Sequence, residues 1–265
     1  MSFTFTSYNV LATGYIKPHF YPRTTPEVLN LEWRIPALVK HIVKLDSDVL
    51  CLQEVDEQTL AALRAALEPP GYESYDARKG GHKPDGCSTF FRSKIFKLKQ
   101  VKRLEYSDGN NLQSNSGHVA LVMTLEHLGH TLGIANTHLK WDAPGTPLEQ
   151  RFGYRQMTQW LLEHQNIAPK IDTWIVCGDF NIEPDNELIA MLQKAGFDYA
   201  HRGLDIFTCN SNDRAKMIDF IFHSRALQSI PILPPEIDDL TPLPSLEQPS
   251  DHLALSTQLE WLAPH

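Results

Sequence analysis

Residues 175–184 read IVCGDFNIEP. The apolar run over residues 173–177 predicts a buried strand that stops at Gly178. Asp179 and Asn181 follow, and since alternate residues of an extended chain share a face, we expect both side chains to point the same way. A carboxylate can accept a proton from water, and an amide can hold an oxyanion. The alternative interpretation is an Asx-rich turn after a strand.

The composition is that of an ordinary globular protein, with 42% hydrophobic and 21% charged residues in a chain of 265. The net charge of -8 argues against wide contact with a nucleic-acid backbone, because proteins that bind nucleic acid non-specifically are usually basic. An enzyme that grips a short end of a nucleic acid needs few such contacts. Carboxylates clustered around a metal ion would also make the chain acidic.

The cysteines predict a reducing compartment. Cys51 and Cys177 lie in apolar strands, where a reduced buried thiol is the rule, and none of the four cysteines has a zinc-binding spacing. The N-terminal segment alternates like a strand and lacks the features of a signal peptide. No apolar run approaches the roughly 20 residues that span a bilayer. We therefore expect a soluble cytoplasmic protein without a membrane span.

Short strands separated by a few helices are expected along the whole chain. The expected helices cover residues 29–45, 58–67, 148–167 and 187–195. The expected strands cover residues 2–10, 48–55, 72–76, 85–92, 96–104, 118–125, 131–137, 206–209 and 217–223, with a last strand ending at residue 259. Loops are expected over residues 77–84, 107–116, 210–216 and 231–249. We see no repeat or linker and expect a single domain over residues 1–265.

Polar side chains stand at or near the ends of several expected strands, in addition to Asp179 and Asn181: Asn9, Glu54, Asp85, His138, Asp219, Asp251 and His252. Each has a simple alternative, such as a turn asparagine or a hydrogen-bonded core histidine. Together they make the set needed to hydrolyse a phosphoester with a hard metal ion. Glu54, with Asp251 or Asn9, offers oxygen ligands, which suit Mg²⁺ or Mn²⁺ and would not suit zinc.

Six motifs occur in the order of a known family: LQE, DGCSTFF, NTHL, GDFN, IDFIF and PSDH, spread over residues 52–252. On these motifs the chain resembles the endonuclease/exonuclease/phosphatase superfamily, metal-dependent phosphoesterases related to DNase I. The wording is most similar to the branch of the Ccr4-type deadenylases, nocturnin and the Angel proteins. The resemblance implies an α/β fold, a four-layered α/β/β/α sandwich of two mixed sheets flanked by helices. It also implies a site at one edge of the sandwich.

The resemblance implies roles for the residues that match these motifs. Glu54 would be the main ligand of Mg²⁺ (or Mn²⁺), with Asn9 and Asp251 near the metal. Asp179 would orient and deprotonate the attacking water.

The same resemblance implies that Asn181 and His138 hold the phosphoryl oxygens. His252 would contact the scissile phosphate, and Asp219 would hold its imidazole in orientation. These roles agree with the chemistry, because a pentavalent phosphorus gathers negative charge that fixed donors and a metal stabilise.

The departures from the branch concern the substrate. Deadenylases of this branch stack adenine on a phenylalanine where this chain has Arg214, counted back from Asp219. Their Trp-Asp-Pro is interrupted here, because Ala143 precedes Pro144. Arg214 is instead a candidate for an extra phosphate, as on a 2′-phosphorylated or cyclic-phosphate end. We expect none of the leucine-rich repeats that recruit some deadenylases to partners.

We therefore expect a Mg²⁺-dependent phosphoesterase acting on single-stranded RNA or RNA ends, as a 3′-exonuclease of the deadenylase type. The substrate-binding candidates are Asp85, Arg214, Asn210, Trp141 and Arg155. One alternative is a phosphatase or phosphodiesterase of small phosphoesters, such as 2′-phosphate or cyclic-phosphate nucleotides, inositol phosphates or lipid head groups. Another is an inactive binding module of the same fold. The expected partner is the phosphoester substrate, RNA or a nucleotide, and we expect a monomer.

Overall fold

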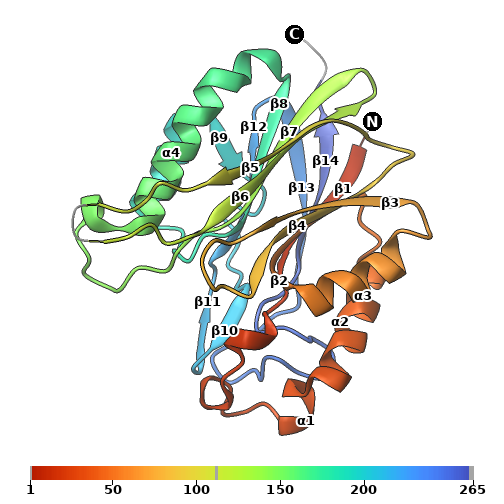
Figure 1. Cartoon of the computed structure of the whole chain (residues 1–265), viewed down its shortest axis with the longest axis vertical. Helices are drawn as coiled ribbons and strands as arrows, with labels where there is room; N and C mark the ends of the chain where they lie inside the picture. Colours follow the sequence, from red (N-terminus) through yellow and green to blue (C-terminus); the bar gives the residue numbers. More distant parts are fainter. Residues whose placement is uncertain (1, 111–112, 263–265) are drawn as a thin grey trace.

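Two six-stranded β-sheets pack face to face, and helices cover both outer surfaces (Figure 1). The structure is a computed structural model that describes residues 2–110 and 113–262. It confirms the expected four-layered sandwich. Residues 111–112 of the loop expected over 107–116 lie outside the described residues. Within the described parts, no helix has the length and apolar character needed to cross a membrane.

The first sheet contains both the first and the last strand, in the order β13-β14-β1-β2-β4-β3. Its strands are β1 (Ser2–Asn9), β2 (Val49–Asp56), β3 (Tyr72–Arg78), β4 (Asp85–Arg92), β13 (Leu227–Ile232) and β14 (Leu255–Trp261). The second sheet has the order β5-β6-β7-β8-β12-β9. Its strands are β5 (Lys97–Glu105), β6 (Val119–His127), β7 (His130–His138), β8 (Thr173–Asp179), β9 (Phe197–Tyr199) and β12 (Asp219–Ser224). Each sheet is mixed, because β1 and β2 are parallel, as are β7 and β8.

Each outer layer is built from amphipathic helices. The helices are α1 (Pro26–Leu29), α2 (Leu31–Leu45), α3 (Glu57–Leu67), α4 (Phe152–Ile167) and α5 (Glu187–Lys194), with short 3₁₀ turns η1 (Thr13–Tyr15), η2 (Pro18–Phe20), η3 (Leu148–Gln150) and η4 (Ala168–Lys170). The apolar faces of α2 and α3 pack on the first sheet. Those of α4 and α5 pack on the second sheet. Because the helices cover the outer faces of the sheets, they do not cover the strand ends at the edge where the candidate site lies.

Strand β2 is buried on both faces, as its unbroken apolar run predicts. Cys51 points into the core between the two sheets, together with Phe5 and Ile134. Leu50 and Leu52 point the other way, toward the helices. Successive strand residues face opposite sides, so one strand serves two cores.

Some segments differ from the expectation. The helix expected over residues 29–45 is divided at Asn30, whose side chain accepts a hydrogen bond from the Glu32 N–H and caps α2. Residues 210–216 are not a loop but most of a hairpin of β10 (Cys209–Ser211) and β11 (Arg214–Lys216). Its turn residues Asn212 and Asp213 have φ of 57° and 53°, which suits a two-residue hairpin turn.

Candidate active site

Three adjacent strands of the second sheet end together at the site. His138 of β7 and Asp219 of β12 lie on either side of Asp179 of β8 in the strand register. The sequence predicted that this strand stops at Gly178. In the structure β8 continues to Asp179. Gly178 has φ of 137°, and a Cβ there would lie 1.7 Å from the Thr137 carbonyl oxygen. Glycine therefore allows β8 to stay beside β7 up to the catalytic candidate.

The first sheet contributes Glu54 in a different way. Strand β2 continues past Glu54, but its register against β4 shifts between Leu52 and Val55, which marks a bulge. Glu54 itself has φ of 56°, and a left-handed conformation of a non-glycine residue costs about 1–3 kcal/mol. Its carboxylate accepts hydrogen bonds from the Ala12 N–H (2.9 Å) and from Asn9 Nδ2 (3.1 Å). These donors hold Glu54 at the sheet edge.

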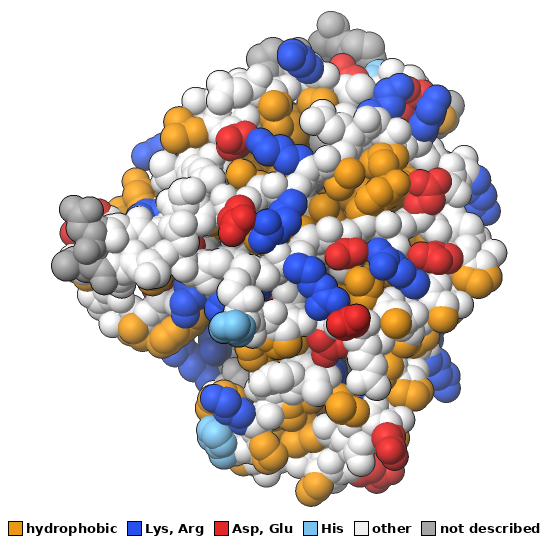
Figure 2. Space-filling model, viewed as in Figure 1, with side chains coloured by type: hydrophobic (Ala, Val, Ile, Leu, Met, Phe, Trp, Pro, Cys, Tyr) orange, Lys and Arg blue, Asp and Glu red, His pale blue; other side chains and the backbone are white. Residues whose placement is uncertain are grey.

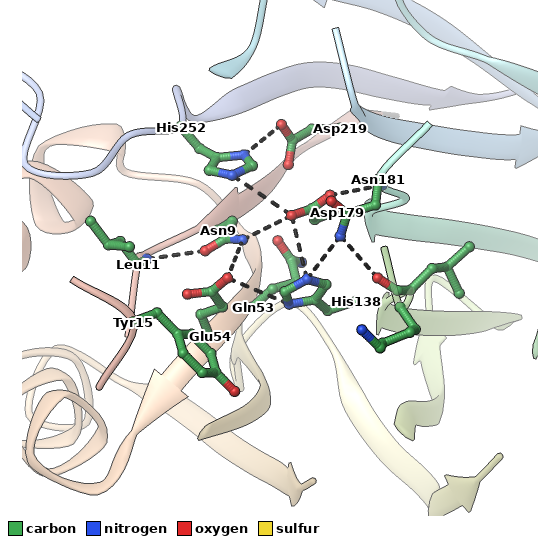
Figure 3. A network of polar contacts seen from close by, with 12 residues as sticks. Asn9, Leu11, Tyr15, Gln53, Glu54, His138, Asp179, Asn181, Asp219 and His252 are labelled. Atoms are coloured by element: carbon green, nitrogen blue, oxygen red, sulfur yellow. Dashed lines mark hydrogen bonds and ion pairs between the residues drawn. The ribbon is translucent and has the colours of Figure 1, made fainter. Parts of the chain in front are cut away.

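Asn9 connects the two sheets (Figure 3). Its Nδ2 donates to Glu54 of the first sheet and, at 2.9 Å, to Asp179 Oδ2 of the second. Its Oδ1 accepts the Leu11 N–H at 3.0 Å, which fixes the orientation of the amide. One buried amide therefore brings two carboxylates together.

His252 and Asp219 form a buried pair. His252 Nδ1 lies 2.8 Å from Asp219 Oδ2, which also accepts a hydrogen bond from the Thr208 hydroxyl at 2.6 Å. The other ring nitrogen, Nε2, lies 3.7 Å from Asp179 Oδ2. Burial disfavours the His252 cation, but Asp219 outweighs it, so the pKa of His252 is raised well above its usual value. Burial, with repulsion from Asp219, raises the pKa of Asp179 to about 7.

Asn181 forms the Asx turn that the alternative interpretation of residues 175–184 expects, and its side chain also faces His138. Its backbone N–H donates to Asp179 Oδ1 at 2.9 Å, which is the Asx turn. Its Nδ2 donates to the Leu139 carbonyl (2.9 Å) and also lies 3.1 Å from His138 Nε2. Asn181 lies beyond the strand, with φ of 53°, so the alternation argument does not explain its orientation.

Lys79 is a site residue that the sequence did not reveal. It is buried, its Nζ lying 2.6 Å from Asp85 Oδ2 and 3.2 Å from His138 Nδ1. The Tyr15 hydroxyl donates to Asp85 Oδ1 at 2.7 Å. Lys79 belongs to the segment expected to be a basic loop, and no sequence pattern marks it as buried.

The Lys79 contact fixes the proton of His138. Burial lowers the pKa of His138 well below its usual value, so the ring is neutral and accepts at only one nitrogen. Lys79 Nζ faces Nδ1 and Asn181 Nδ2 faces Nε2; both are donors, and the neutral ring can accept from only one of them. Because the charged ammonium is the stronger donor, we assign Nδ1 as the acceptor and the proton to Nε2. In this tautomer the Nε2–H of His138 and Asn181 Nδ2 are two donors 3.1 Å apart that do not bond each other. Such a pair is suited to one anionic oxygen.

Two further amides, Gln53 and Asn136, join the sheets beneath the site. Gln53 Nε2 donates to Asn136 Oδ1 at 2.8 Å, and Asn136 Nδ2 donates to the Ser88 carbonyl at 3.0 Å. All three residues are buried. The sequence does carry a signal for these amides, because they stand within the LQE and NTHL motifs beside Glu54 and His138.

Several groups of side chains could hold a metal ion. Glu54, His138 and Asp179 each offer a ligand atom within 4.8 Å of the others, and so do Asp179, Asp219 and His252. Burial raises the pKa of Glu54; Lys79 opposes this shift and the nearby Asp251 adds to it. A divalent cation would relieve the repulsion between these carboxylates, so the donor set fits a hard metal ion.

Trp141 and Arg214 line a cleft of about 370 Å³ beside Asn181. Trp141 is 54% exposed, and Arg214 forms an ion pair with Glu183 at 2.6 Å. These two candidates therefore lie beside the catalytic candidates, as a substrate role requires.

The other three substrate-binding candidates have partners within the protein. Asp85 holds Lys79, as described above. Arg155 Nη2 donates to Gln113 Oε1 at 3.0 Å, and Asn210 Nδ2 donates to the Thr241 carbonyl at 2.7 Å. Asn210 thereby anchors the proline-rich segment that follows β13. Asp251, a metal candidate, accepts the Tyr21 hydroxyl at 3.0 Å.

The sandwich fold and the carboxylate–histidine site at its edge define a class of protein that sequence comparison also recovers. Residues 7–252 match the Endonuclease/Exonuclease/phosphatase family, and the chain belongs to it. This confirms the resemblance drawn from the six motifs.

Three relatives place the chain more closely. "Protein angel homolog 2" of Mus musculus is 29% identical over 247 residues, covering 89% of this chain and 43% of the relative. The "CCR4-Not complex 3'-5'-exoribonuclease subunit Ccr4" of Candida albicans is 27% identical over 256 residues, covering 84% of this chain and 32% of the relative. The crystal structure of ANGEL2, described as a 2′,3′-cyclic phosphatase in complex with adenosine-2′,3′-vanadate, superposes with a TM-score of 0.84 at 24% identity, covering 98% of this chain and 95% of that one. The chain spans less than half the length of the two curated relatives.

Proposed function

We propose that this chain hydrolyses phosphodiester bonds at the 3′ end of single-stranded RNA, with Mg²⁺ or Mn²⁺ as cofactor. The observation that carries the proposal is the position of Asp179, whose Oδ2 lies 3.6 Å from His138 and 3.7 Å from His252. A base thus stands between two groups that can bind a phosphate. The name of the Candida relative, a 3′-5′ exoribonuclease, supports the choice of substrate.

We further propose that the chain acts as a single domain and as a monomer; the site residues described above belong to one sandwich of two sheets. Its four cysteines are buried and free, which supports a reducing compartment such as the cytoplasm.

Glu54 would hold the metal ion, together with Asp251 and with Asn9 beside them. A bound Mg²⁺ would supply a Lewis acid that polarises a phosphoryl oxygen. Asn9 also keeps Glu54 and Asp179 in fixed positions through the two hydrogen bonds of its Nδ2. The positive charge of Lys79 lies close enough to lower the pKa of Glu54, which helps to keep this ligand ionised.

Asp179 would accept the proton of the attacking water. Its carboxylate is held in position by hydrogen bonds from Asn9 Nδ2 and from the Asn181 N–H. The raised pKa of Asp179 makes it a stronger base than an exposed aspartate.

The other polar groups would bind the phosphoryl oxygens. His138 Nε2–H and Asn181 Nδ2–H converge as two donors and would stabilise the charge that develops on one oxygen. His252 would donate from Nε2 to the scissile phosphate. Asp219 keeps this imidazole oriented and charged, as a buried carboxylate does for other catalytic histidines.

A second candidate is hydrolysis of a 2′,3′-cyclic phosphate at an RNA end. It is favoured by the description of ANGEL2 as a 2′,3′-cyclic phosphatase and by the cleft beside Asn181, where Arg214 could meet an added phosphate. In this reaction the same base and donors would act on a strained cyclic ester.

The test is a substrate panel with purified protein: oligoadenylate, mixed-sequence RNA, RNA ending in a 2′,3′-cyclic phosphate, and an inositol phosphate, each with and without Mg²⁺ or Mn²⁺. We expect metal-dependent shortening of RNA that falls at least about 100-fold in Glu54→Gln. Glu73→Gln, an exposed glutamate on β3, is the matched control and should keep wild-type rates. Opening of the cyclic phosphate alone would favour the second candidate, and turnover without metal would contradict both.

A further inference from the structure

A further group of possible metal ligands lies beside the catalytic candidates and includes a sulfur atom. A ring nitrogen of His252, a carboxylate oxygen of Asp251 and the Cys209 sulfur all lie within 4.8 Å of one another. The three residues are buried, with exposed fractions of 8% or less. The donor atoms of a tetrahedral zinc ion stand roughly 3.5 Å apart, since its bonds measure about 2.0–2.3 Å. Small movements of the side chains would therefore close this group around an ion.

The backbone holds Cys209 against His252. Two hydrogen bonds, of 2.9 Å and 2.7 Å, join the backbone of residues 208–210 to that of residues 251–253. These bonds flank an antiparallel bridge between Cys209 and His252. Two residues in such a non-hydrogen-bonded pair have their side chains close together on one face. The proximity of the thiol and the imidazole therefore follows from the backbone arrangement, although the two residues are far apart in the sequence.

His252 already has the outer partner that a zinc-bound histidine commonly uses. Such histidines donate their other ring N–H to a carboxylate, which fixes the ring. His252 Nδ1 lies 2.8 Å from Asp219 Oδ2, so Nε2 is the nitrogen available to a metal. Burial raises the pKa of the Cys209 thiol, and His252 opposes this shift. A metal ion that binds a thiol displaces its proton outright.

The donor set of this group favours zinc over magnesium. Mg²⁺ prefers oxygen ligands in an octahedral arrangement, whereas Zn²⁺ takes sulfur, nitrogen and carboxylate oxygen in a tetrahedral one. On the viewed face of the molecule, acidic side chains are interspersed with basic ones (Figure 2). Zinc held loosely on such a surface would meet no thiol, because all four cysteines are buried. A bond from a thiolate to the metal would therefore mark the buried group.

We propose that Cys209, Asp251 and His252 form an inhibitory Zn²⁺ site. The ion would occupy His252 Nε2, which is proposed to donate to the scissile phosphate, and Asp251, a proposed ligand of Mg²⁺. Binding would release the protons of the thiol and of the imidazolium to solvent, and a water would complete the tetrahedron. The site goes beyond the proposed function, whereas its inhibitory effect rests on that function.

The first test compares zinc inhibition of the wild type, Cys209→Ala and Cys51→Ala. The last is the matched control, since Cys51 is a buried thiol in the core between the sheets. RNA hydrolysis is measured at saturating Mg²⁺ and buffered Zn²⁺, relative to the uninhibited rate of each protein. We expect the half-inhibiting Zn²⁺ concentration to rise at least about 10-fold in Cys209→Ala, because losing even an outer partner weakens a metal site by that factor. Cys51→Ala should match the wild type.

A second test needs no activity. Co²⁺ can replace Zn²⁺ in tetrahedral sites and absorbs in the near ultraviolet when a thiolate binds it. Titration with Co²⁺ in the presence of Mg²⁺ should produce this absorption in the wild type and in Cys51→Ala. It should be lost in Cys209→Ala and in Cys209→Ser, which keeps the size of the side chain and serves in both tests if the alanine variant does not fold.

Hydrolysis that is insensitive to zinc, or equally sensitive in the wild type and a folded Cys209 variant, would overturn the inference. In the second case zinc would act through the carboxylates alone. Absence of the cobalt–thiolate absorption from the wild type would overturn it as well. Failure of the proposed function would be seen separately, as absence of metal-dependent hydrolysis before zinc is added, and the cobalt titration would then decide whether the site exists.

Discussion

The two sheets supply the site in different ways. The second sheet places His138, Asp179 and Asp219 at the ends of three neighbouring strands in register, and the positive φ before Asp179 falls on a glycine, Gly178. The first sheet places Glu54 by a bulge and a left-handed residue. A regular strand end sets the direction of a side chain at little energetic cost. The bulge turns the Glu54 carboxylate toward groups that it would not reach from a regular strand. The proposed base, Asp179, therefore lies at the end of a strand in regular register, whereas the proposed metal ligand, Glu54, lies on a bulge.

The largest expected effect removes the base from the regular sheet. Asp179→Asn keeps the size of the side chain but can accept only one of the two hydrogen bonds from Asn9 and the Asn181 N–H, and it cannot accept a proton from water. We expect kcat to fall about 10³–10⁴-fold with an unchanged fold. Steady-state kinetics with circular dichroism as the folding control measures this. A loss below about tenfold would mean that the base lies elsewhere.

Breaking the neighbouring pair should cost less. Asp219→Asn leaves His252 without its charged partner, so the imidazolium loses its stabilisation and its fixed orientation. We expect roughly a 100-fold fall in kcat, with little change in KM. Asp198→Asn, a half-buried carboxylate on β9 that pairs with Arg202, should not alter kcat and serves as the control. A pure KM effect would contradict the role assigned to the pair.

Lys79 links the two sheets, because it contacts Asp85 of β4 and His138 of β7. Its replacement tests whether this link sets the tautomer of His138. In Lys79→Met, His138 is free to move its proton to Nδ1, and one of the two converging donors is lost. We expect about a tenfold fall in kcat, partly restored in Lys79→Arg. The ¹⁵N shifts of the His138 ring report the tautomer directly. An unchanged Nε2–H tautomer in Lys79→Met would refute this explanation.

The smallest expected effect is on stability and concerns the bulge at Glu54 in the first sheet. Glu54→Gly and Glu54→Ala both remove the carboxylate, but only the alanine variant keeps a Cβ at positive φ. We expect the glycine variant to be more stable than the alanine variant by about 1 kcal/mol. Urea unfolding of the two proteins measures the difference. Equal midpoints and slopes would show that the bulge stores no backbone strain.

The fold and most of the second-sheet site could be predicted from sequence. The end of a strand can be predicted where an apolar run is followed by a polar residue, as at His138 and Asp179. Six motifs in the family's order then indicated the family. What remained hidden depends on contacts between distant segments. The bulge at Glu54 leaves no local signal, since β2 contains neither glycine nor proline.

The buried Lys79 was hidden for a similar reason. Its neighbours Arg78, Lys83 and the glycines predict a solvated loop, and its burial arises only when Asp85 and His138 approach from other strands. The hairpin of β10 and β11 was missed because Asn212 and Asp213 resemble loop residues, although the same pair suits a tight turn.

The pairing of β1 with β14 has a consequence for biosynthesis. Strand β1 leaves the ribosome before β14 and finds this partner only when residues 255–261 have been made. His252, which lies shortly before β14, is also made long after Asn9 and Glu54. We therefore expect truncated or nascent chains to expose one side of β1 and to lack hydrolytic activity. In such a topology, a cell releases the enzyme in working form only once translation of this region is finished.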